Sequence, residues 1–166
     1  MNALFSRRSI RRYLPDPVDP AIIKELLAAA MAAPSAGNQQ PWRFVVMTER
    51  VLLKEIPNFH PHAKMVPEAP AVILVAGDLT AEKHKGYWTQ DCSAAVENLL
   101  IAIQDKGLGA VWLGVYPRED RVAGFRSLLS LPEHIVPFAC IPIGKPAEFK
   151  EPANRYDEAK VHWNKW

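Results

Sequence analysis

The stretch "TQDCSAAVENLLIAIQDKG", residues 89–107, decides the fold of this chain. It predicts a helix over residues 89–106, with Gly107 as the C-terminal stop. Within residues 92–103 only three side chains are polar, so the helix is apolar on nearly every side. A helix of this kind must be covered all round. In a chain of 166 residues we expect a subunit interface to supply part of that cover.

The elements around this helix predict an α+β domain. Asp19 followed by Pro20 is a typical helix start, and Pro34 ends that helix. Residues 57–70 carry four prolines and are expected to be irregular. Because no domain boundary is visible, residues 1–166 are expected to form one domain, a sheet with helices on its faces. The remaining elements predicted are strands over 43–48, 71–77, 109–116 and 135–144, and short helices over 49–56 and 119–130.

Composition and charge exclude several classes of function. The chain is 49% hydrophobic and 23% charged, which is typical of a soluble globular protein. The formal net charge is only +2, so a broad nucleic-acid surface is not expected. No signal peptide or membrane-spanning run is recognised, so we expect a cytoplasmic protein without a membrane partner. Cys92 and Cys140 are expected to be buried small side chains rather than a disulfide.

A second stretch, "SRRSIRRYLPDPVD" at residues 6–19, concentrates positive charge. Arg7, Arg8, Arg11 and Arg12 repel one another unless an anion lies among them, and guanidinium groups bind phosphate bidentately. The alternative is a solvated run of arginines at a helix start. Arg12 is expected to be solvated or ion-paired in either case.

The common catalytic motifs are absent from the sequence. It has no GxxxxGK[ST], no GxGxxG in the order strand–glycines–helix, no GxSxG and no HExxH. The "HPH" at residues 60–62 is a weak metal pattern without acidic or cysteine ligands at suitable spacing, so no metal is expected. A phosphate-type site without a nucleophile, metal or acid–base set points to a phosphorylated cofactor that carries the chemistry itself.

A third stretch, "APSAGNQQPWRF" at residues 33–44, is a turn of small and amide-bearing residues between a helix and a strand. Small residues allow a flat ring to approach closely, and Asn38 and Gln40 can bind its polar edge. The alternative is an ordinary connecting loop. Asp91 and Glu97, on the helix after residue 88, are expected to be helix-surface or interface pairing groups.

Four segments together resemble the nitroreductase family of FMN-dependent oxidoreductases. They occur in the family's order as "RRSIRRY", "APSAGNQQPW", "NLLIAIQDKGLGAVWLG" and "NRYDEAKVHW", and they extend from about Ser6 to the C-terminus. The resemblance is to the short members of the family. It implies a nitroreductase-like fold with a mixed or antiparallel central sheet flanked by helices, and with the long central helix at a dimer interface.

The resemblance also implies a homodimer with two FMN sites, each built from both subunits. A charge at Val96 or Leu99 is then expected to split the dimer. The C-terminal extension, about residues 145–166, with Trp163 and Trp166, is expected to pack on the partner subunit, or otherwise on its own domain. The implied roles are phosphate and ribityl binding by Arg7, Arg8, Ser9 and Arg155, the pyrimidine edge for Arg11, a contribution from the other subunit by Pro34, Ser35, Ala36 and Asn38, and ring contact by Trp112, Leu113 and Gly114.

The activity implied is ping-pong hydride transfer from NAD(P)H through flavin N5 to nitroaromatics, quinones or similar acceptors. No side chain need act as acid or base, so no catalytic residue is nominated. An alternative is a flavin-binding carrier or redox sensor with little turnover, and another is a phosphate-responsive module without flavin. Trp88, Tyr87, Phe59 and His60 are left open between lining a substrate pocket and ordinary packing or loop positions.

Overall fold

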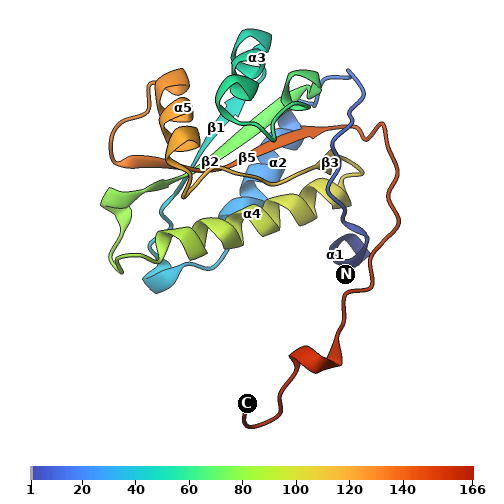
Figure 1. The fold of residues 1–166 in the computed structure, drawn as a ribbon, viewed down its shortest axis with the longest axis vertical. Coiled ribbons are helices and arrows are strands. Elements are labelled where there is room, and N and C mark those ends of the chain that lie inside the picture. The colour runs from blue at the N-terminus through green and yellow to red at the C-terminus, as the bar shows by residue number, and fades with distance from the viewer. Residues whose placement is uncertain (1) are drawn as a thin grey trace.

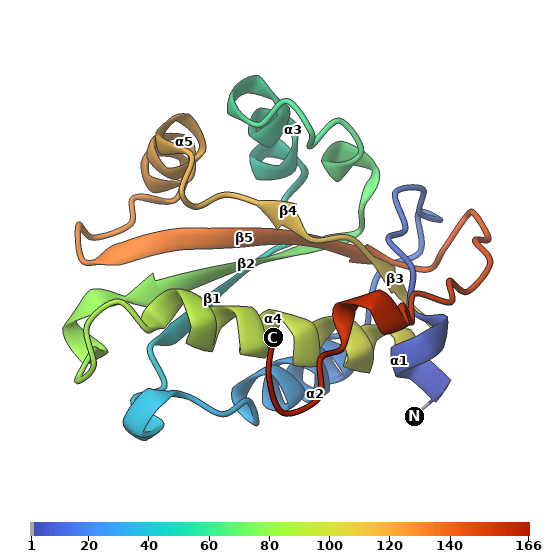
Figure 2. The ribbon, with the colours of Figure 1, turned by 60° about the horizontal axis from the view of Figure 1, so that its bottom comes forward.

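The computed structural model describes residues 2–166 as three layers, with a sheet between two pairs of helices (Figures 1 and 2). No helix in that range is long and apolar enough to cross a membrane. The helices are α1 (Asn2–Ser6), α2 (Pro20–Met31), α3 (Arg50–Phe59), α4 (Trp88–Asp105) and α5 (Glu119–Leu129), with 3-10 turns at Ala36–Asn38, Val66–Glu68, Leu79–Ala81 and Glu158–Lys160. The strands are β1 (Trp42–Met47), β2 (Ala71–Asp78), β3 (Gly109–Ala110), β4 (Leu113–Gly114) and β5 (Ile135–Gly144).

The sheet is antiparallel, which confirms the predicted α+β class. Its order is β1-β2-β5-β3, and β4 also pairs with β5. All eight residues of β2 and eight of the ten in β5 are buried, because helices cover both faces of the sheet. This explains why both strands are continuous apolar runs rather than alternating ones.

Each face of the sheet has its own hydrophobic core (Figure 2). On one face α2 and α4 pack with residues such as Leu26, Leu99 and Ile141. On the other face α3 and α5 pack with residues such as Leu53, Leu74 and Phe125. The predicted start of α2 is confirmed, since the Asp19 carboxylate accepts a hydrogen bond from the backbone N–H of Ala21 at 2.8 Å.

The prediction of one strand over 109–116 is wrong in one respect, because the structure divides this segment into β3 and β4. Both parts pair with β5 in one continuous register, so the interruption at Val111 and Trp112 lies opposite Ile141 and Pro142. Pro142 has no N–H to donate to a neighbouring strand. Its carbonyl accepts a hydrogen bond from Tyr13 Oη at 3.3 Å instead.

Two other local predictions need correction. Helix α3 continues through Pro57 to Phe59, whose ring packs edge-on against Phe125 at 5.0 Å between centroids. The segment from 57 is therefore not irregular from its first residue. Helix α1 was not predicted at all; it is a five-residue turn with no buried residue.

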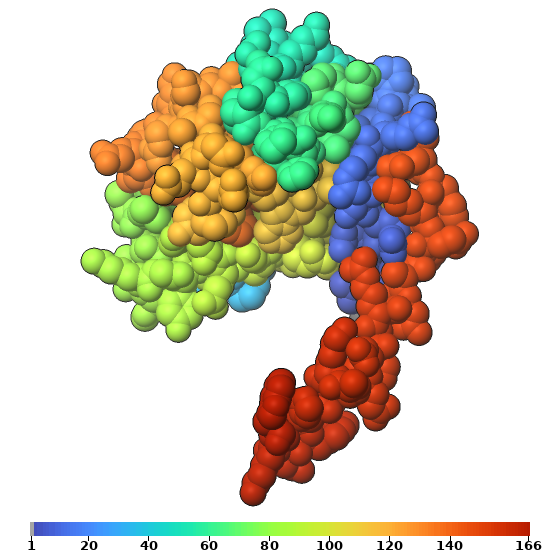
Figure 3. Space-filling view, viewed as in Figure 1, coloured from blue at the N-terminus to red at the C-terminus, as the bar shows by residue number. Residues whose placement is uncertain are grey.

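The outer surface of α4 and the C-terminal tail both carry apolar side chains that their own subunit does not cover completely. Val96 and Leu99 are fully buried within their own subunit, so the expectation that a charge there specifically splits a dimer is wrong. Ala94 and Ile101, on the other side of the helix, are only half-buried. Residues 151–166 are exposed throughout and extend away from the body (Figures 1 and 3). Of the predicted extension, residues 145–150 do pack on their own domain, where the Ala147 N–H donates to the Arg12 carbonyl at 2.9 Å, and residues 152–156 border a cavity with Arg7 and Arg8. The remaining residues, 157–166, are exposed.

Candidate functional site

The arginine-rich segment is fixed against the edge of the sheet. The backbone N–H of Ile10 donates to the Ala110 carbonyl at 2.9 Å, and Tyr13 Oη donates to the Ile10 carbonyl at 2.6 Å. Tyr13 is buried, which raises the pKa of its hydroxyl far above the usual value and keeps it protonated as a donor. Gly109 permits this close approach, because a Cβ there would lie 2.8 Å from the side chain of Ile10.

Behind this anchor lies a small cavity of about 260 Å³, which we name the basic hollow. Its lining contains no acidic residue and consists of Arg7, Arg8, Ser9, Arg11, Lys150 and Arg155. The structure thus brings together five of the predicted phosphate and flavin residues from the two ends of the chain. Lys150 was missed by sequence reasoning; its Nζ donates to the Ser9 carbonyl at 2.6 Å and lies 3.3 Å from Glu148.

Among the arginines of the basic hollow, Arg7 is the one that forms an ion pair within residues 2–166. Its Nε is buried without a hydrogen-bond partner, and lies 3.5 Å from Glu97 Oε1 on α4. A buried donor without a partner is costly. An anion in the basic hollow would satisfy Arg7, so the lining fits a phosphate group.

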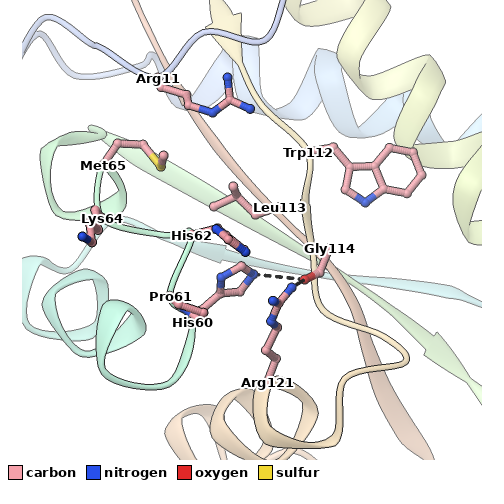
Figure 4. Close-up of a pocket in the computed structure, with 10 residues that line it drawn as sticks. All are labelled: Arg11, His60, Pro61, His62, Lys64, Met65, Trp112, Leu113, Gly114 and Arg121. Atoms are coloured by element: carbon pink, nitrogen blue, oxygen red, sulfur yellow. Dashed lines mark hydrogen bonds between the residues drawn. The ribbon is translucent and has the colours of Figure 1, made fainter.

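A second cavity, of about 530 Å³, opens beside β4 (Figure 4). We name it the β4 cavity. The predicted ring-contact residues Trp112, Leu113 and Gly114 all line it, together with Arg11. The other lining residues are His60, which the sequence left open as a pocket residue, and five to which the sequence gave no place in a ligand site: Pro61, His62, Lys64, Met65 and Arg121.

The backbone of the β4 cavity is held by two side chains. His60 Nε2 lies 3.0 Å from the Gly114 carbonyl, and Arg121 Nη1 donates to the same oxygen at 2.7 Å (Figure 4). Burial, and then the nearby Arg121 cation, lower the pKa of His60 below its usual value. Neutral His60 therefore donates from Nε2, and this pair fixes the orientation of the backbone at Gly114.

Arg11 lines both cavities, so the basic hollow and the β4 cavity adjoin at this side chain. The combination offers an anion site at one end and a wall of backbone and apolar side chains at the other. A ligand with a phosphate joined to a flat ring fits such a pair of cavities.

The loop containing Pro34, Ser35, Ala36 and Asn38 lines neither cavity. It lies at the N-terminal end of α4, where the backbone N–H of Ala36 donates to Asp91 Oδ1 at 2.9 Å. Asp91 is buried, so its predicted role as a helix-surface or interface group is wrong; it fixes this loop instead. Gln39 Nε2 also donates to Asp91, at 2.7 Å.

The structure distinguishes the residues whose roles the sequence left open. Trp88 is buried and packs edge-on against Tyr116 and Phe138, with centroids 4.8 and 5.8 Å away. Tyr87 is exposed. Only His60 of this group lines the β4 cavity. Arg12 is exposed and lines neither cavity.

Comparison with known proteins decides the family. The model of the nitroreductase family matches residues 4–64 and 59–145. The chain belongs to the nitroreductase family. The predicted resemblance to this family is thereby confirmed.

Relatives of this nitroreductase-family chain span its full length. A candidate NADH dehydrogenase/NAD(P)H nitroreductase of Methanothermobacter thermautotrophicus is 47% identical over 100% of this chain and 87% of its own. A crystal structure with the same description from Bacteroides thetaiotaomicron is 42% identical, covers 99% of this chain and 96% of its own, and gives a TM-score of 0.95. A candidate nitroreductase from Desulfovibrio desulfuricans, solved in complex with FMN, is 30% identical over 99% and 96%, with a TM-score of 0.86.

Within residues 2–166 no group of three or more His, Cys, Asp or Glu side chains is placed to hold a metal ion. Cys92 and Cys140 are both buried, and burial raises the pKa of the Cys92 thiol to about 12. Neither thiol is poised to act as a nucleophile.

Proposed function

We propose that the chain is an FMN-dependent NAD(P)H oxidoreductase that acts on nitroaromatic, quinone or similar electron acceptors. The observation that carries the proposal is the pair of adjoining cavities that share Arg11. Their order, an anion site followed by a wall suited to a flat ring, corresponds to the order of phosphate and isoalloxazine in FMN. The FMN complex of the Desulfovibrio relative supports this choice of cofactor.

Arg7, Arg8 and Arg155 would neutralise the phosphate in the basic hollow, with Ser9 as a hydroxyl donor. Arg11 would place a cation beside the pyrimidine edge of the ring, where it favours negative charge on reduction. Leu113 and Gly114 would present backbone N–H groups toward the ring, beside the Gly114 carbonyl that His60 and Arg121 hold.

We further propose that the working form is a homodimer with a site shared between subunits. Pro34, Ser35, Ala36 and Asn38 line neither cavity of their own subunit, so in this arrangement they complete the site of the partner. The half-buried outer surface of α4 and the exposed tail, with Trp163 and Trp166, would then be covered by the partner.

Bound FMN would supply the chemistry by taking a hydride from NAD(P)H at N5 and passing it to an acceptor after the nicotinamide has left. The overall balance for a quinone is NAD(P)H, a proton and the quinone giving NAD(P)⁺ and the hydroquinone. The protein binds, orients and supplies charge; no side chain of this chain is assigned a proton-transfer role.

The deciding experiment is an anaerobic visible spectrum of the purified protein after equilibration with FMN, followed by NADH and then NADPH. We expect the oxidised flavin band to be retained through gel filtration and to bleach rapidly with at least one of the two nucleotides. Reoxidation by added quinone would complete the cycle and identify the productive reductant.

Two other outcomes would replace the proposal. A yellow protein that neither nucleotide bleaches would favour the flavin-binding carrier or redox sensor. A colourless protein that does not retain FMN would mean that the basic hollow holds another anion, and would favour a phosphate-responsive module.

A further inference from the structure

The β4 cavity carries more positive charge than its proposed part in flavin binding uses. Among its ten lining residues there are three permanent cations and two imidazoles, and no carboxylate. Within residues 2–166, the side chains of Arg11, Lys64 and Arg121 form no ion pair with an acidic residue. Uncompensated like charges that line one cavity favour an anionic ligand.

The cofactor's own phosphate does not account for this charge. The basic hollow supplies Arg7, Arg8, Lys150 and Arg155 for that purpose, and none of these lines the β4 cavity. Arg11 is assigned to the pyrimidine edge of the ring under the proposed function. Arg121 holds the Gly114 carbonyl. Lys64 and His62 remain, and both are exposed at the cavity.

The positions of these side chains suggest where an anion would lie. Figure 4 shows Arg11 and Arg121 on opposite sides of the cavity, with His62 and Lys64 on the segment that faces the Trp112–Gly114 wall. In the same view the His62 imidazole points toward Gly114, and Lys64 lies farther from the wall on the same segment. An anion bound by His62, with the long and exposed side chain of Lys64 reaching it, would be close to a ring lying against that wall. Phosphates of a nicotinamide dinucleotide are separated from their ring by a ribose, whereas a carboxylate or sulfonate can be attached to the reacting ring itself.

We infer that the electron acceptor of this enzyme is an anionic ring compound, a quinone or nitroaromatic with a carboxylate, sulfonate or phosphate substituent bound by Lys64 and His62. The inference rests on the proposed function. A quinone takes a hydride and a proton to give the hydroquinone, and a nitro group takes a hydride and a proton to give a nitroso group and water. In both cases two electrons are transferred, and the anionic substituent takes no part in the electron transfer. Lys64 and His62 determine specificity and are not catalytic residues.

The test uses the FMN-loaded protein, reduced anaerobically with one equivalent of its productive nucleotide and then mixed with an acceptor in a stopped-flow spectrometer. Naphthoquinone and naphthoquinone sulfonate form the acceptor pair. For each acceptor, the second-order rate constant of the variant is divided by that of the wild type, which cancels the difference in reduction potential between the two acceptors.

For the Lys64→Gln variant we expect the rate constant for the sulfonate to fall roughly 3-fold, the scale of one exposed ion pair, with the neutral quinone unchanged. The double variant Lys64→Gln/His62→Gln should lose more. Lys54→Gln is the matched control, because Lys54 is exposed on α3 and lines neither cavity. It should change neither rate constant. Added salt should lower the sulfonate's rate constant in the wild type more than in the variant.

Several results would overturn the inference. Equal losses for both acceptors would mean that Lys64 only maintains the cavity, and no loss for either would mean that it binds no acceptor. If reduction of the flavin by NADH or NADPH slows while its reoxidation by both acceptors is unchanged, the cations serve the dinucleotide. Failure to retain or reduce flavin at the loading step would instead reject the proposed function, and with it this inference.

Discussion

Strand β2 and the C-terminal residues 151–166 both carry large apolar side chains, yet they differ completely in what covers them. All of β2 is buried between the two helical layers of its own subunit. The tail is exposed throughout, with Trp163 81% and Trp166 101% exposed. The sheet and its helices thus form a complete core within one chain. The tail and the 34–38 loop gain a role only through something outside that core, which we propose is a second copy and its cofactor.

The largest expected effect tests the self-contained part. Leu74→Ala removes a side chain that is 0% exposed in the core against α3 and α5, and should lower the free energy of unfolding by about 2–5 kcal/mol. Urea unfolding followed by circular dichroism measures it. Val46→Ala, at a 40%-exposed position of β1, is the control and should cost less than about 1 kcal/mol. Similar losses at both positions would contradict the buried core described here.

The next effect concerns the boundary between the two regions, the basic hollow. Arg7→Ala should weaken FMN binding by about 1.5–3 kcal/mol, the scale of a hydrogen bond to a charged group. Quenching of FMN fluorescence on titration gives the affinity. Arg12→Ala is matched in charge but lines neither cavity, so it should leave the affinity unchanged. Unchanged binding in the Arg7 variant would remove the phosphate from the basic hollow.

A smaller effect should appear in the tail. Trp163→Ala should weaken subunit association by roughly 1–2 kcal/mol, as expected for an aromatic side chain buried in an interface. Sedimentation equilibrium measures association, and the unfolding of the isolated subunit should be unaffected because Trp163 contacts no core residue there. A variant that remains as tightly dimeric as the wild type would exclude a role for Trp163 in the contact.

The smallest effect concerns a polar group inside the self-contained part. The pKa of His60 is lowered in the folded state, mainly by burial, so the unfolded state binds the proton more readily. Stability contributed by this group is complete above the unfolded pKa of about 6.5 and declines as the pH falls below it. His60→Gln should therefore flatten the loss of stability between about pH 7.5 and about pH 5. An identical pH dependence in both proteins would exclude His60 as its source.

The sequence predicted the elements whose side chains are covered by their own chain. Helix α4 and strands β2 and β5 are long apolar runs, and their positions agree with the structure within two residues. The split of β3 and β4 depends on the missing N–H of Pro142, a residue distant in sequence, so the local pattern of 109–116 could not reveal it. Val96 and Leu99 were misassigned because an all-round apolar helix does not show which face its own sheet covers.

The candidate site was predicted only where its residues stand in recognisable sequence motifs. The arginines and the Trp112–Gly114 segment stand in motifs that the resemblance made visible. Lys150, Lys64 and Arg121 stand in no such motif, and only the fold brings them to the two cavities. Asp91 was missed because a carboxylate on a helix looks like a surface group until the loop whose N–H groups it binds is placed beside it.

Gly109 matters when cofactor binding by a duplicated and diverged copy of such a chain is inferred from its sequence. It sets how deeply the segment from Ser9 to Ile10 lies against the sheet, since any Cβ at this position collides with Ile10. A duplicated chain could retain every arginine of the basic hollow and still lose its cofactor through an alanine here. Counting binding residues would then classify a flavin-free pseudoenzyme as active, and this single backbone contact is the feature that distinguishes the two.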